Sequence, residues 1–210
     1  KRERITPMAL LLLVVATTAA SAVPAFPVQF VATVETTAHL IAEDSEYPPR
    51  TGRKLVFYDL PNKRAKAAIL EGLDAGKNYT RRFDLRQDYR ERDGRCDRSY
   101  LDEDVPLPVA PSGASLDDGV IDGRRVRRFD VVESHSSRSI VSYDAETAFP
   151  RRLVNEWKDA DSWSPLMTYD LLDLTPVAPA EALFDVPHAN CSRWTGGWPR
   201  LHLFHHYFRF

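Results

Sequence analysis

The sequence has only two cysteines, and it lacks the motifs of the common hydrolases and nucleotide-binding enzymes. It contains no G-x-S-x-G nucleophile elbow, no H-E-x-x-H zinc motif and no glycine-rich phosphate loop. Paired carboxylates are frequent, as in any acidic chain, and they indicate nothing by themselves. We therefore expect a protein that is not an enzyme and that uses no cofactor.

The chain also lacks an apolar run long enough to cross a bilayer. Residues 8–20 (MALLLLVVATTAA) form a mostly apolar run of 13 residues, whereas a helical span needs about 20. Basic residues precede this run, and Ala20-Ser21-Ala22 offers small residues for cleavage. The pattern predicts a signal peptide over residues 1–22, with an uncleaved signal anchor as the alternative. The mature protein is then expected to be secreted or in the endomembrane lumen, without a stable membrane span.

Neither sign of charge is in large excess. Beyond residue 22 the chain keeps 25 basic and 29 acidic side chains, which is a net charge of −4. Such a balance provides no overall attraction for nucleic acid or for an anionic membrane surface. We expect the local basic clusters at 81–82 and 124–128 to be solvated strand faces.

The two cysteines, Cys96 and Cys191, are expected to form one disulfide in the oxidising secretory route. This bond would close a loop of about 95 residues and stabilise the fold by roughly 3–5 kcal/mol. Asn78-Tyr79-Thr80 is an N-glycosylation sequon, and we expect Asn78 to lie in a surface turn.

Alternating apolar and polar residues predict strands along most of the chain. In residues 166–173, Met167, Tyr169 and Leu171 fall on one face of an extended segment. Further strands are expected at 28–34, 54–60, 64–70, 79–85, 124–133, 139–144 and 152–157. Residues 88–100 are too charged to assign, 102–119 should be a long loop, and 176–184 favours one helical turn. These patterns predict an antiparallel all-β protein of about eight or nine strands.

Two groups of potential metal ligands are better explained without a metal. The spacing of the acidic residues does not match a calcium loop, so we expect a solvated loop at Asp102, Glu103, Asp104, Asp117 and Asp118. Several histidines could in principle share zinc or copper, but no carboxylate or free thiol stands beside His188, His202, His205 and His206. The tail at 194–210 is expected to pack on the protein or to bind a protein partner, because Trp194 and Trp198 add aromatic surface.

Several short motifs occur in a recognisable order before Cys191: residues 26–30 (FPVQF), 57–59 (FYD), 120–123 (VIDG), 143–144 (YD), 167–170 (MTYD) and 184–187 (FDVP). This order resembles eukaryotic secreted domains with the LolA-like fold, a group that includes ependymin-related proteins. A similar domain precedes the protease in some papain-like cysteine peptidases. The resemblance spans about residues 26–192 and implies a half-open β-barrel around an apolar cavity, although the chain has fewer cysteines than we expect of ependymins.

The predicted architecture is mainly β: one curved antiparallel sheet over residues 23–193 that forms a half-open barrel with few short helices. An incompletely filled concave face could hold a lipid or another hydrophobic small molecule. The residues expected to line it are Phe30, Val34, Phe57, Phe83, Trp157, Met167, Tyr169 and Leu171. For each of them, a place in a closed core is the alternative.

The predicted function is therefore a non-catalytic, secreted or lumenal protein that binds a hydrophobic ligand. The alternative is a protein–protein interaction domain, related to the N-terminal domain of a cysteine peptidase, with its contact in the C-terminal tail.

Overall fold

The computed structural model describes residues 25–107, 115–132, 135–186 and 188–194. Its strands are β1 (Gln29–Ala38), β2 (Thr51–Asp59), β3 (Arg64–Glu71), β4 (Asn78–Arg82), β5 (Gln87–Arg92), β6 (Arg95–Tyr100), β7 (Asp117–Ile121), β8 (Arg124–Val132), β9 (Ser137–Asp144), β10 (Pro150–Asp159), β11 (Ser162–Leu171) and β12 (Ser192–Arg193). They form one sheet in the order β12-β6-β5-β4-β3-β2-β1-β11-β10-β9-β8-β7. Every neighbouring pair is antiparallel except β12 and β6.

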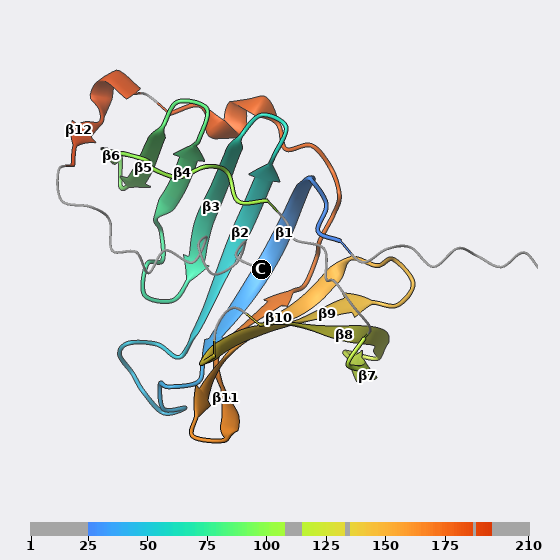
Figure 1. Cartoon of the computed structure of the whole chain (residues 1–210). Coiled ribbons are helices and arrows are strands. Elements are labelled where there is room, and N and C mark those ends of the chain that lie inside the picture. Colours follow the sequence, from blue (N-terminus) through green and yellow to red (C-terminus); the bar gives the residue numbers. More distant parts are fainter. Residues whose placement is uncertain (1–24, 108–114, 133–134, 187, 195–210) are drawn as a thin grey trace, which may run out of the picture.

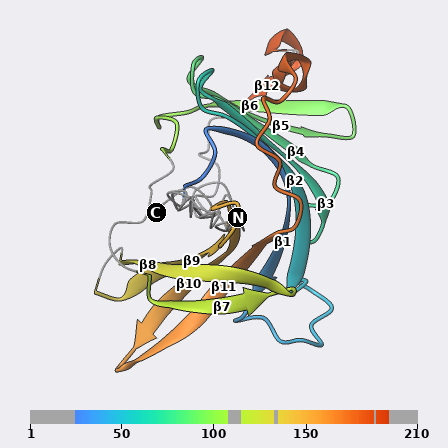
Figure 2. The ribbon, with the colours of Figure 1, turned by 90° about the vertical axis from the view of Figure 1, so that its right-hand side faces the viewer.

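The sheet bends into an open trough. Figure 1 and Figure 2 show β1–β6 as one wall and β7–β11 as the other, with the bend where β1 meets β11. The first and last strands of the order, β12 and β7, do not pair with each other, so the barrel stays open. This arrangement confirms the predicted fold class, a mainly β, strongly curved antiparallel sheet.

The sequence prediction missed two hairpins, and the described residues contain twelve strands rather than eight or nine. The charged stretch at 88–100 forms the β5–β6 hairpin, and β7 begins inside the stretch predicted as a long loop. Both hairpins turn on Asp-Gly pairs with positive φ, 50° and 74° at Asp93-Gly94 and 49° and 76° at Asp122-Gly123. An Asp-Gly pair is a strong hairpin signal because two-residue turns of this kind need φ above zero at both positions. Asp93-Gly94 stands in the sequence between charged segments, where alternation gives no strand signal.

The β2–β3 hairpin is confirmed, including the alanine-rich second arm that helix propensity disfavours as a strand. Ala65 and Ala67 are 1% and 3% exposed. Ala65 lies opposite Tyr58 on β2, and Ala67 lies opposite Tyr79 on β4. Large rings beside small methyl groups fill the interior without overlap, so packing overrides the local helical preference.

A buried carboxylate fastens the turn of this hairpin. Asp59, 1% exposed, accepts hydrogen bonds from Gln29 Nε2 at 2.8 Å, from Asn62 Nδ2 at 2.9 Å and from Arg64 Nε at 2.7 Å. Burial alone would raise the pKa of Asp59, but these hydrogen bonds and the Arg64 charge hold the pKa below its usual value. The network ties β1, the turn and β3 together.

The segment after β11 crosses the outer face of the sheet. Its short 3-10 helix η1 (Glu181–Phe184), which confirms the predicted helical turn, packs against β3. Phe184 is fully buried, with its ring 4.6 Å from the Arg64 guanidinium, and Lys66 Nζ donates to the Leu183 carbonyl at 2.9 Å. A second turn, η2 (His188–Asn190), leads to Cys191. No helix within the described ranges has the length and apolar character of a membrane span.

The predicted disulfide between Cys96 and Cys191 is present. It joins β6 to the residue before β12, where Ser192 and Arg193 pair in parallel with Asp97 and Arg98. A two-residue strand has few hydrogen bonds of its own, so the covalent bond holds it at the edge of the sheet.

Replacing both cysteines, Cys96→Ser with Cys191→Ser, should lower the free energy of unfolding by about 3–5 kcal/mol, because the unfolded chain loses a long closed loop. Urea unfolding of both proteins measures the difference, and wild type treated with a reductant is the matched control. The far-ultraviolet signal of the sheet should persist before the transition. A loss well below about 1 kcal/mol would show that the bond constrains little.

Candidate functional site

The inner face of the trough is built from rows of residues that lie opposite one another on adjacent strands. One row runs through β11, β1, β2 and β3, and it contains Leu171, Val34, Lys54 and Ile69. The next row runs from β1 to β6, and it contains Ala32, Val56, Ala67, Tyr79, Arg90 and Asp97. Successive side chains on a strand point to opposite faces, so all of these residues share one face. We call it the concave face.

Aromatic side chains join the two walls at the centre of this face. The Phe26 ring lies 6.4 Å from Phe30 on β1 and 6.3 Å from Tyr143 on β9, and Phe129 on β8 lies 5.8 Å from Tyr143. Each of these four side chains is at most 7% exposed. The walls therefore enclose one apolar cluster rather than two separate cores.

Seven of the eight predicted lining residues lie on the concave face. Six of them belong to its apolar cluster or pack against it: Phe30, Val34, Phe83, Met167, Tyr169 and Leu171. Trp157 follows Leu153 and Asn155 on the same face of β10 and is 38% exposed. Phe57 lies on the opposite face, because it alternates with Val56 and Tyr58. The sequence prediction missed this because residues 55–58 (LVFY) are apolar on both faces of the strand.

The chain after β6 passes over part of the concave face. Leu101 is buried in the apolar cluster and Val105 packs against it. The Tyr58 hydroxyl donates to the Pro106 carbonyl, and Arg86 Nη1 donates to the Glu103 carbonyl at 2.9 Å. These contacts hold residues 101–106 against the concave face, between the β4–β5 turn and Tyr58.

One lysine stands within the apolar floor. Lys54 is 3% exposed, and its Nζ lies 5.3 Å from the centre of the Tyr169 ring. Burial disfavours the charged form and lowers the pKa of Lys54 to about 7. The floor therefore holds an amine that loses its proton more readily than an exposed lysine does. Its alternation with Val56 and Tyr58 in the sequence was the signal that would have placed it on this face.

Toward β4, β5 and β6 the concave face becomes polar. Arg81, Asp88 and Ser99 lie opposite one another on these three strands and are 4%, 4% and 7% exposed. Arg81 Nε lies 3.7 Å from Asp88 Oδ2, and burial is the main reason that the pKa of Asp88 is raised to about 6. The expectation of a solvated basic face at 81–82 was wrong for Arg81, because Arg81 lies on the concave face, where it is buried between Asp88 and Glu103.

Asn78 is the first residue of β4, half-buried and paired with Ala68 and Glu91, so the expected surface turn ends just before it. Its glycosylation stays a prediction. Residues 195–210, which include His202, His205, His206 and Trp198, lie outside the described residues. Trp194 is described: it is 44% exposed, and the Arg90 guanidinium lies 5.8 Å from its ring centre.

No known family model matches this chain, and no curated protein matches it by sequence. Solved structures do match. An uncharacterized conserved protein from Thermus thermophilus is 10% identical with a TM-score of 0.53, over 80% of this chain and 91% of that one. MucB in the Pseudomonas aeruginosa MucA/MucB complex is 16% identical with a TM-score of 0.44, over 78% and 57%. The LolA superfamily protein NE2245 from Nitrosomonas europaea is 14% identical with a TM-score of 0.37, over 79% and 94%.

The T. thermophilus protein shares the overall fold, and at 10% identity the likeness concerns the fold alone. The relation to the ependymin group stays a prediction.

The buried Lys54 should make stability depend on pH between about 7 and 10. The unfolded chain binds the Lys54 proton up to about pH 10.4, whereas the folded protein releases it near pH 7, so stability rises as the pH increases across this window. The Lys54 contribution between pH 7 and 9.5 is about 3 kcal/mol at most.

In Lys54→Met, this part of the slope of unfolding free energy against pH should disappear. Urea unfolding at several pH values measures the slope. Lys158→Met, which removes an exposed lysine from β10, is the control and should keep the slope. An unchanged slope in Lys54→Met would show that Lys54 stays charged in the folded protein.

Proposed function

We propose that this chain is a LolA-like, non-catalytic binding protein that holds a lipid or another hydrophobic small molecule on its concave face. The observation that carries this function is the continuous apolar surface shared by the two walls of an open trough. Along β10 this surface passes from fully buried Leu153 to Trp157, which is 38% exposed. Met167 on the neighbouring strand β11 is half-buried and lies opposite Asn155 of β10. An apolar ligand would enter at this end.

The energy available at such a face suits an acyl chain. Burial of hydrocarbon contributes about 0.8 kcal/mol per methylene group, so roughly fifteen methylenes contribute about 12 kcal/mol. After an association cost of about 4 kcal/mol, this leaves about 8 kcal/mol, which corresponds to micromolar binding. The open edge between β12 and β7 lets the walls separate without breaking a strand pair. Lys54 in the floor would favour a ligand with an acidic end, because a nearby carboxylate favours the protonated amine.

A secreted or lumenal location fits this proposal, since the disulfide between Cys96 and Cys191 forms and persists in oxidising compartments. The second function, an interaction domain related to that of cysteine peptidases, stays a prediction because most of its expected contact, residues 195–210, lies outside the described structure.

Charged side chains at the entry end should weaken ligand binding while leaving the fold intact. We expect Trp157→Glu with Met167→Glu to reduce the affinity for a fluorescent fatty acid by tenfold or more, because each carboxylate would have to be desolvated or displaced. Fluorescence titration measures the affinity, and thermal unfolding confirms that the variant is folded.

Leu73→Glu with Leu40→Glu is the matched control. Both leucines are exposed and lie in connections between strands, at 59% and 74% exposure, so the same change there should leave binding within about twofold. Wild-type protein that binds no fatty acid and yields no lipid on solvent extraction would contradict the proposed function.

A further inference from the structure

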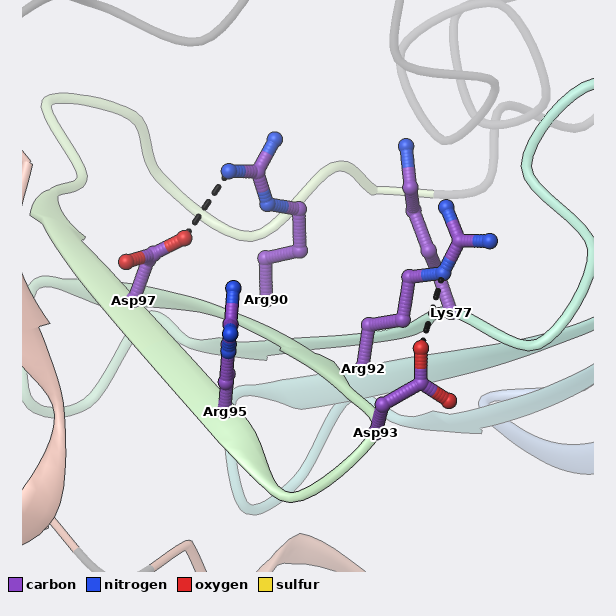
Figure 3. Close-up of a pocket in the computed structure, with 6 residues that line it drawn as sticks. All are labelled: Lys77, Arg90, Arg92, Asp93, Arg95 and Asp97. Carbon is purple, nitrogen blue, oxygen red and sulfur yellow. Dashed lines mark hydrogen bonds and ion pairs between the residues drawn. The ribbon is translucent and has the colours of Figure 1, made fainter.

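A basic pocket of about 610 Å³ lies at the polar end of the sheet. Its lining residues are Lys77, Arg90, Arg92, Asp93, Arg95 and Asp97. Figure 3 shows the four basic side chains rising from the same side of the ribbon toward a common space. Arg90 and Asp97 belong to the row that begins at Ala32 on β1, so the pocket continues the concave face beyond its apolar part.

Two of these arginines face each other in an arrangement that the hairpin alone disfavours. Arg92 and Arg95 lie directly opposite at the ends of β5 and β6, and like charges at opposed positions destabilise a strand pair. Asp93 in the turn lies 3.4 Å from Arg92, whereas Arg95 makes no ion pair with any described residue. An anion between the two arginines would turn this repulsion into attraction.

The other two basic residues are already held in place. Arg90 Nη2 donates to Asp97 Oδ2 at 2.8 Å, and the Arg90 guanidinium also lies near the Trp194 ring. Lys77 donates to Asp74, which also accepts from the Tyr79 hydroxyl at 2.8 Å. The four cationic side chains and the carboxylates of Asp93 and Asp97 give the pocket a net charge of +2. Counting Asp74, which accepts a hydrogen bond from Lys77, reduces this net charge to +1.

We propose that Arg90, Arg92, Arg95 and Lys77 form a binding site for a phosphate monoester group. Such a group carries about −1.5 to −2 charges near neutral pH, which matches the excess in the pocket. The planar guanidinium fork pairs with phosphate oxygens through two hydrogen bonds, and three arginines line this pocket. This site does not depend on the proposed acyl-binding function, because the phosphate group alone supplies the contacts.

The test is calorimetric titration at low ionic strength with inorganic phosphate and, separately, with dihexanoyl phosphatidic acid. We expect Arg92→Gln with Arg95→Gln to weaken binding by about tenfold or more, because two charge-assisted contacts are lost. Both side chains are exposed, so the unfolding temperature should hardly change. The matched control, Arg124→Gln with Arg125→Gln, removes the same charge from an exposed end of β8 and should bind as wild type does.

The two probes distinguish the source of the phosphate. Equal affinity for both supports a site for free or sugar-borne phosphate, and binding of phosphatidic acid alone supports a lipid headgroup. Failure of both probes to bind overturns the proposal, as does unchanged binding by the Arg92→Gln, Arg95→Gln variant. Acetate competing as strongly as phosphate at equal ionic strength also overturns it. None of these results affects the fatty-acid titration, so that titration tests the proposed acyl-binding function independently.

Discussion

The structure depends on the alternation of side chains in a single long antiparallel sheet. Because each strand places every second residue on the concave face, bending the sheet buries those residues and leaves their neighbours half-exposed. In β1 this separates Phe30, Ala32 and Val34, all fully buried, from the residues between them. A shift of one residue in any strand pair would exchange the two faces, so the apolar pattern also determines the register.

Buried ion pairs on both faces of the sheet reinforce this arrangement. Asp59 with Arg64, and Arg81 with Asp88, are buried partners that lie on neighbouring or consecutive strands. Losing one member of such a pair leaves a buried charge without compensation, which is costly in free energy. These partners therefore oppose alternative pairings of β2, β3, β4 and β5. The disulfide has a similar role at the sheet edge, where the two residues of β12 have little else to hold them.

The concave face changes along its length. Apolar residues lie on β1–β3 and β8–β11, β4 carries both Tyr79 and Arg81, and charged residues lie on β5 and β6. Lys54 lies within the apolar part, and Arg90, Arg92 and Arg95 lie at the far polar end. A face of this kind suits an amphiphile better than a plain hydrocarbon, since apolar and anionic groups would each find a complementary surface. Because β12 and β7 do not pair with each other, the two walls can separate without breaking the hydrogen-bond ladder.

The amino-acid sequence by itself determined the fold class, most strand positions, the β2–β3 hairpin and the pairing of the two cysteines, because these follow from local alternation, turn residues and cysteine count. Alternation also assigned to one face seven of the eight residues that were expected to line it. Only the tertiary structure decided that Phe57 faces outward and that Lys54 and Arg81 are buried. Those outcomes depend on strand register and on the bend of the sheet, which bring together residues far apart in the chain and which no local pattern encodes.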